Sequence, residues 1–168
     1  MASPERRHRP TYIAGALYAV FLAAIGTWPR HVDSALPLAD WALTRSLADI
    51  AGLTPEQVVA AAEVAANAVL FVPLGMMVAW WWPRAPLVAA AGMGLAVAVT
   101  IEVAQQVAPI DRTPSLVDVV VNVAGACLGF LAVRAAASHP RHRLALLGTV
   151  GVLVAAVLGV LLWGLATA

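Results

Sequence analysis

The chain has 168 residues, of which 62% are hydrophobic and only 11% are charged, and its mean hydropathy is +0.86. A soluble domain carries about 25% charged residues because its surface must face water, so this composition excludes an ordinary soluble globule and a disordered tail. The net charge of +1 excludes a polyanion-binding field, and a single cysteine, Cys127, excludes an intramolecular disulfide or a multi-thiolate metal site. We therefore expect a membrane protein with no nucleic-acid partner.

Five apolar runs are long enough to cross about 30 Å of hydrocarbon. They predict an all-α, polytopic membrane bundle that forms a single domain over residues 1–168, with about five transmembrane helices. The five spans are roughly Thr11–Trp28, Val58–Trp82, Leu87–Ala108, Leu116–Val133 and Leu144–Leu165. The first run follows basic residues but is not followed by a convincing small-residue cleavage site. It is therefore interpreted as an uncleaved first helix, with a cleaved signal peptide as the alternative.

The arginines predict the orientation of these helices. Placing the N-terminus in the cytoplasm leaves only Arg30, Arg45 and Arg112 on the outer side. The arginines that then lie inside are Arg6, Arg7, Arg9, Arg84, Arg134, Arg141 and Arg143. This distribution follows the positive-inside rule and predicts a multi-pass protein with a cytoplasmic N-terminus.

The outer segment between the first two spans has an amphipathic pattern. Its apolar residues recur at helical spacing, while Arg45 and Asp49 are predicted to form an i,i+4 pair on the opposite face. The apolar positions are Leu36, Ala39, Leu43, Leu47 and Ile50. We expect a helix that lies on the outer surface of the bilayer.

Two spans begin with similar capping signals. Thr54, Pro55 and Gln57 predict a capping box at the start of the second span. Ser115 with Asp118 three residues later predicts a comparable start for the fourth span.

Polar residues within the apolar runs occur in pairs at helical spacing. Each of three spans carries a carboxylate with a carboxamide on the same face, because residues three or four apart are neighbours on a helix. The pairs are Glu63 with Asn67, Glu102 with Gln105 and Gln106, and Asp118 with Asn122. A charged side chain near the bilayer centre costs about 2.5 to 3.5 kcal/mol on insertion scales, so such residues usually serve a partner or a function.

Helix rise predicts a similar depth for the three carboxylates. At 1.5 Å per residue, Glu63 lies about 12 Å into its span, Glu102 about 10 Å and Asp118 about 5 Å from their outer ends. We expect a polar pocket in the outer third of the membrane, with Asp111 and Arg112 in the turn above it. The alternatives are that Asp118 only caps its helix, that Glu63 lies among the headgroups, and that the carboxamides only bond between helices.

The spacing of these residues resembles that of the VanZ-like membrane family, which is named for a teicoplanin-resistance protein. The resemblance covers residues 12–134, leaves the helix over 144–165 outside it, and allows either Gln105 or Gln106 as the family glutamine. It rests on Glu63-x3-Asn67-x2-Leu70-Phe71-x-Pro73-x-Gly75, Glu102-x2-Gln105, Arg112, and Ser115-x2-Asp118-x3-Asn122-x2-Gly125-x3-Gly129. The resemblance implies a protein of the bacterial cytoplasmic (inner) membrane, linked in some members to glycopeptide resistance at the cell envelope, and it implies no agreed reaction.

We expect a ligand-binding site made of the polar residues that share these faces. The residues are Glu63, Asn67, Glu102, Gln105, Gln106, Arg112, Asp118 and Asn122. Carboxylates and carboxamides can hold sugar or peptide groups, and an arginine can hold a phosphate. The expected partner is a membrane lipid, a lipid-linked envelope precursor or a glycopeptide antibiotic, with no cofactor and no metal. The oligomeric state stays open.

Two other classes of function stay open. Closely placed carboxylates could act as a general acid or base, or hold a cation, in an enzyme acting on a lipid phosphate. The sequence contains no evident activated nucleophile or histidine-based triad, so binding without catalysis is slightly favoured. The third interpretation is an accessory membrane subunit whose polar residues hold its helices together.

Overall fold

The computed structural model describes residues 15–25, 38–107, 115–139, 145, 148–152, 155, 156 and 159. These residues form helices and turns, with no strand among them. After a helix over Gly15–Ile25 come a short 3₁₀ helix η2 (Leu38–Asp40), α2 (Ala42–Ala51), α3 (Pro55–Trp81), α4 (Leu87–Val107) and α5 (Leu116–Ser138). The all-α prediction is confirmed.

Three helices in the described part of the chain, α3, α4 and α5, are long and apolar enough to cross a membrane. They correspond to the second, third and fourth predicted spans. The first predicted span contains the helix Gly15–Ile25, which is shorter than a span, and its flanking residues lie outside the described ones. Most of the fifth predicted span also lies outside them, although its described residues are helical.

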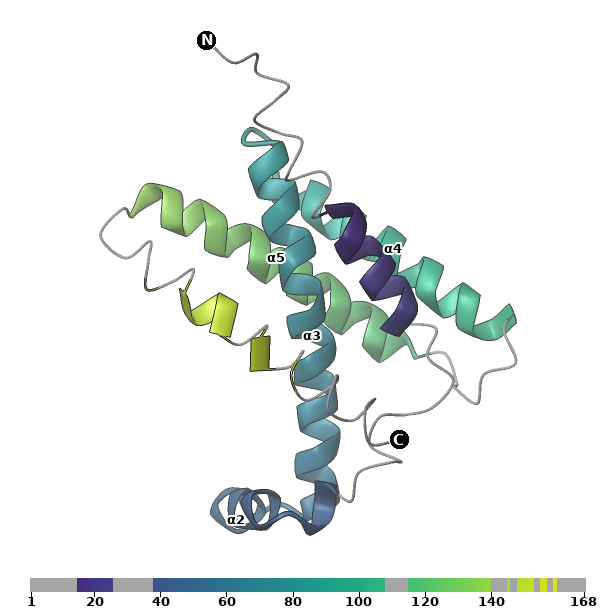
Figure 1. The fold of residues 1–168 in the computed structure, drawn as a ribbon, viewed down its shortest axis with the longest axis vertical. Coiled ribbons are helices and arrows are strands. Elements are labelled where there is room, and N and C mark those ends of the chain that lie inside the picture. Colours follow the sequence, from purple (N-terminus) through teal and green to yellow (C-terminus); the bar gives the residue numbers. More distant parts are fainter. Residues whose placement is uncertain are drawn as a thin grey trace.

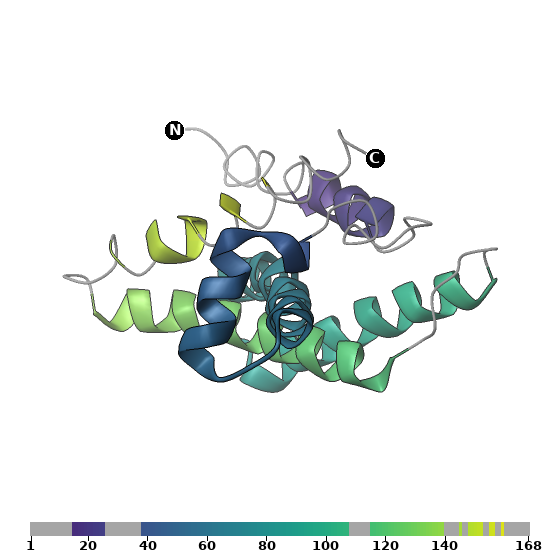
Figure 2. The same cartoon turned by 90° about the horizontal axis from the view of Figure 1, so that it is seen from below.

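Helices α4 and α5 cross α3 obliquely (Figures 1 and 2). Three glycines make this crossing with α3 close. A Cβ atom added at Gly125 would overlap the backbone oxygen of Ala68, and one at Gly129 would overlap that of Val72. From the other side, a Cβ at Gly75 would overlap the backbone of Ala126. Gly125 and Gly129, four residues apart on α5, therefore permit close packing, and α5 runs in the same direction as α3 at the crossing.

Apolar side chains fill the rest of the contact. One buried cluster joins Leu22 of the first helix to Leu70 and Phe71 of α3, Ala98 of α4 and Ala126 of α5. A second cluster lies nearer the turn between α3 and α4 and consists of Val78, Ala79, Ala90 and Phe130. Small residues of α4 and α5 thus let large side chains of α3 pack between them.

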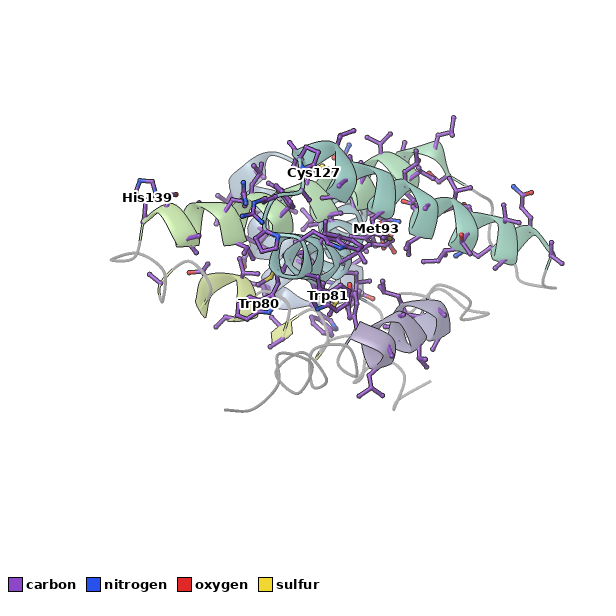
Figure 3. The ribbon with its side chains drawn as sticks, turned by 90° about the horizontal axis from the view of Figure 1, so that it is seen from above. Trp80, Trp81, Met93, Cys127 and His139 are labelled. Atoms are coloured by element: carbon purple, nitrogen blue, oxygen red, sulfur yellow. The ribbon has the colours of Figure 1, made fainter. Side chains whose placement is uncertain are left out.

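The first helix is fastened to α3 at two points. The Tyr18 hydroxyl donates a hydrogen bond to the backbone oxygen of Leu70, three residues before Pro73. Trp81 lies against Gly15, where a Cβ would overlap its ring, and Figure 3 shows this side chain near the first helix. A proline inside a membrane helix disrupts nearby backbone hydrogen bonds, and neighbouring side chains such as Tyr18 can compensate.

The turn between α3 and α4 lies beside the C-terminal half of α5. Arg134 donates a hydrogen bond to the Pro83 backbone oxygen, and its guanidinium carbon lies 5.7 Å from the Phe130 ring centroid. This contact puts Arg84, next in the chain after Pro83, at the same end of the bundle as Arg134. Trp80 and Trp82 are exposed at this end, as is common for tryptophans at a membrane interface.

Helix α2 confirms that the segment before the second span is helical. It lies across the N-terminal end of α3 in both views (Figures 1 and 2). Leu43, Leu47 and Ile50 are exposed, whereas Thr44 and Ala48 on the adjacent face are buried. The predicted pairing of Arg45 with Asp49 is wrong. Arg45 instead donates to Asp40 at 2.7 Å, because η2 brings that carboxylate beside the first turn of α2.

Candidate functional site

Several of the polar groups predicted to share a site meet where α4 ends and α5 begins. Ser115 is the N-cap of α5, and its hydroxyl accepts a hydrogen bond from the backbone N–H of Asp118 at 3.3 Å. The backbone N–H of Ser115 donates to Oε2 of Glu102 on α4 at 3.1 Å. In a capping box this second bond would come from the side chain three residues after the cap. Glu102 therefore completes the α5 cap from a different helix.

This arrangement leaves the Asp118 carboxylate available for a contact with α3. The Asn67 side-chain amide donates to Asp118 Oδ1 at 3.2 Å. Both side chains are half-buried. Asp118 thus contributes its backbone to the cap and its side chain to the α3–α5 contact. The alternative interpretation, in which Asp118 only caps its own helix, does not account for the bond between its carboxylate and Asn67.

Asn122 lies one turn after Asp118 on the same face of α5. Its side chain is 8% exposed, and its Oδ1 atom is buried without a hydrogen-bond partner. Buried polar atoms are almost always hydrogen-bonded, because leaving one unsatisfied costs about 1–3 kcal/mol. This orphaned oxygen is the strongest sign in the described residues that the site is incomplete without a further group.

The two candidate glutamines are placed differently. Gln105 is 6% exposed, whereas Gln106 is exposed at the C-terminal end of α4. Because Gln105 follows Glu102 by three residues and is buried, it is the better candidate for the family glutamine.

Glu63 and Arg112 are not placed in the hydrogen-bond network described above. Glu63 has an exposed side chain one turn before Asn67 on α3. From α3, Asn67 makes the contact with Asp118, and Glu63 lies one turn before it on the same helix. Arg112 and Asp111 lie outside the described residues.

Ser115 is a site residue that sequence reasoning assigned only to a helix cap. Its backbone and hydroxyl connect Glu102 to Asp118. The sequence signal for this role is its position three residues before Asp118, together with Glu102 near the end of the preceding span. We call Asn67, Glu102, Ser115, Asp118 and Asn122 the polar cluster.

The polar cluster contains more acceptors than donors. Among the described residues, each carboxylate accepts one bond within the cluster, and a second oxygen on Glu102 and on Asp118 can accept another. Arg45 and Arg134 form their side-chain hydrogen bonds elsewhere. No group of three or more His, Cys, Asp and Glu that could hold a metal ion occurs among the described residues. The geometry suits a ligand that brings donors.

Comparison with known proteins gave one match. The family model VanZ/LLP1 matches residues 11–137, a range that includes α3, α4, all of α5 except its last residue, and the whole polar cluster. No curated protein and no solved structure matched the chain.

Proposed function

Since this chain belongs to the VanZ/LLP1 family and has membrane-spanning helices, we propose that its polar cluster binds the polar headgroup of a lipid-linked envelope precursor or a glycopeptide. Binding there would influence the sensitivity of the cell to glycopeptide antibiotics such as teicoplanin. We place the protein in the bacterial cytoplasmic membrane, with its N-terminus in the cytoplasm and the cluster towards the outer leaflet. The function proposed is recognition without chemical turnover.

The buried, unsatisfied Asn122 Oδ1 is the observation that carries this proposal. A cluster that only held helices together would be expected to satisfy its own buried acceptors, because no water is available inside the bilayer to do so. The neighbouring Glu102 and Asp118 are charged groups in apolar helices, and such groups commonly mark a binding site. The adjacent apolar surface of the helices would accommodate the tail of a membrane ligand.

Two charge-neutralising variants test the proposal. We expect Glu102→Gln and Asp118→Asn to recover at least about tenfold less bound lipid or glycopeptide than the parent, because charge-assisted hydrogen bonds are the stronger ones. The measurement is mass spectrometry of ligand that co-purifies from native membranes, at matched protein levels. Thr100→Ala is the control, because Thr100 is exposed on α4 and its hydroxyl bonds only the Ala96 backbone oxygen.

A second readout tests the link to resistance. In a strain that this protein protects, both charge-neutralising variants should lower the inhibitory concentration of teicoplanin towards that of cells lacking the protein, whereas Thr100→Ala should not. Full protection by Glu102→Gln at a normal level of expression would overturn the proposed function.

An accessory structural role is the second candidate, and one observation favours it. The bonds Asn67–Asp118 and Ser115–Glu102 each join two different helices. A purely structural cluster predicts that Asp118→Asn lowers thermal stability and protection together. A binding site predicts that protection falls while the melting temperature is retained or rises. Measuring both quantities on the same variant separates the two functions.

A further inference from the structure

Asn122 lies one turn after Asp118 on the same face of α5. In an α-helix the Cα–Cβ bond tilts towards the N-terminus, so Asn122 leans along α5 in the direction of Asp118, one turn earlier. Its side chain is more than nine-tenths buried, and its Oδ1 has no partner. The missing partner must be a hydrogen-bond donor, because an amide oxygen can only accept.

The nearest charged members of the cluster require the same kind of partner. Among the described residues, Glu102 accepts one bond from Ser115 and Asp118 accepts one from Asn67, so each carboxylate has a second oxygen that can accept from a further donor. With Asn122 Oδ1, this makes three acceptors on adjacent turns of two contacting helices. Two of the three carry negative charge, which favours a positively charged group over a neutral hydroxyl.

We infer that the polar cluster takes a primary ammonium group, with Glu102, Asp118 and Asn122 each accepting one of its three N–H bonds. This inference rests on the proposed function and names the chemistry of the headgroup. A primary ammonium has three donors and no acceptor, so it matches the three acceptors in number and offsets their charge. A phosphate has only acceptors and would be repelled by both carboxylates.

Four matched lipids test the inference with the full-length protein in detergent micelles. Phosphatidylethanolamine has a primary ammonium, phosphatidylcholine has the same charge without N–H donors, N-acetyl-phosphatidylethanolamine has no positive charge, and phosphatidylglycerol has hydroxyl donors. We expect phosphatidylethanolamine to bind at least about tenfold more tightly than each of the others, a difference of about 1.4 kcal/mol, by native mass spectrometry. Free phosphoethanolamine, added as a competitor, shows whether the amine needs a lipid tail.

Asn122→Leu gives the second part of the test. This variant removes the unsatisfied oxygen, so we expect the preference for phosphatidylethanolamine to disappear while the melting temperature of the ligand-free protein stays the same or rises. A merely structural asparagine would instead lower that melting temperature when replaced. Thr100→Ala is again the control and should keep the lipid preference.

The outcomes separate this inference from the proposed function. If all four lipids bound equally and Glu102→Gln abolished this binding, the preference for an ammonium group would be overturned. The proposal that the polar cluster binds a headgroup would still hold. If phosphatidylglycerol bound as tightly as phosphatidylethanolamine, a hydroxyl donor would be sufficient for binding. This result would also overturn the inference of an ammonium ligand. Lipid or glycopeptide recovery that Glu102→Gln and Asp118→Asn leave unchanged would overturn the proposed function itself. A preference that persists in Asn122→Leu would overturn the inference, because Asn122 would then not be one of the acceptors that select the ammonium.

Discussion

Helix α5 contacts its neighbours differently in its two halves. Up to Asn122 it meets α3 and α4 through polar groups, which include the bonds Asn67–Asp118 and Ser115–Glu102. From Gly125 onward it meets α3 through backbone, with no side chain at Gly125 or Gly129 to separate the two helices. The contact of the second half with α3 depends on close packing. The first half keeps an unsatisfied acceptor, which a protein under selection for stability alone would not need.

Disrupting the close contact between α3 and the second half of α5 should have the largest effect on stability. In Gly129→Val, the new side chain would overlap the backbone oxygen of Val72, which cannot move without shifting α3. We expect a loss of about 3 kcal/mol in the free energy of unfolding, or failure to accumulate, because overpacking against backbone is poorly relieved. Gel filtration and thermal denaturation in detergent measure this.

Gly92→Val is the matched control for that change. Gly92 lies within α4, and a Cβ there would meet nothing within 4 Å. The substitution should therefore change stability by less than about 0.5 kcal/mol. If the two glycine variants behaved alike, the close approach of α3 and α5 would not be a source of stability.

The two helix caps give a smaller and more specific comparison. Thr54 caps α3 locally with Gln57, whereas the cap at Ser115 includes Glu102 from α4. We expect Thr54→Ala and Ser115→Ala each to cost about 1 kcal/mol in thermal unfolding. Only Ser115→Ala should reduce the recovery of co-purified ligand, since Thr54 lies outside the polar cluster. Equal ligand recovery from both variants would contradict a binding role for the start of α5.

The smallest expected effect concerns the Asn67–Asp118 bond. A double-mutant cycle with Asn67→Ala and Asp118→Ala should give a coupling free energy of about 0.6 kcal/mol, the average for such bonds in a membrane bundle. Unfolding in denaturant is the measurement, and Val64→Ala with Asp118→Ala is the reference pair, because Val64 is exposed. A coupling free energy well above that of the reference pair would show that the Asn67–Asp118 bond helps to join α3 to α5. Strictly additive effects of the two substitutions would show that it does not.

Much of this fold could be predicted from local sequence. Apolar length gave the three long helices, and the Thr54-to-Gln57 spacing gave the capping box found at α3, because both depend on residues that are close along the chain. Gly125 and Gly129, which lie four residues apart in the sequence, are found at a helix contact. Small residues four apart have few other uses in a membrane helix.

The site was predicted less completely, because spacing tells which residues share a face but not which face turns inward. The same spacing rule allowed Gln105 and Gln106, and only the packing of α4 against its neighbours buries Gln105. The spacing rule also predicted that Ser115 and Asp118 form a local helix cap like that of Thr54 and Gln57. The contact from Glu102 to Ser115 depends on how α4 returns beside α5, which no local pattern contains.

The length of α3 has a consequence for the surrounding bilayer. Its 27 residues extend about 40 Å, whereas the 21 residues of α4 extend about 32 Å, close to the thickness of the hydrocarbon. Hydrophobic mismatch of this size is usually relieved by tilting. Helix α2 lies across the start of α3 with Leu43, Leu47 and Ile50 exposed, and these side chains gain free energy only in contact with acyl chains. We therefore expect the contact of α2 with the acyl chains to hold the start of α3 near the hydrocarbon. This contact would limit how far α3 extends into water and would favour a tilted α3.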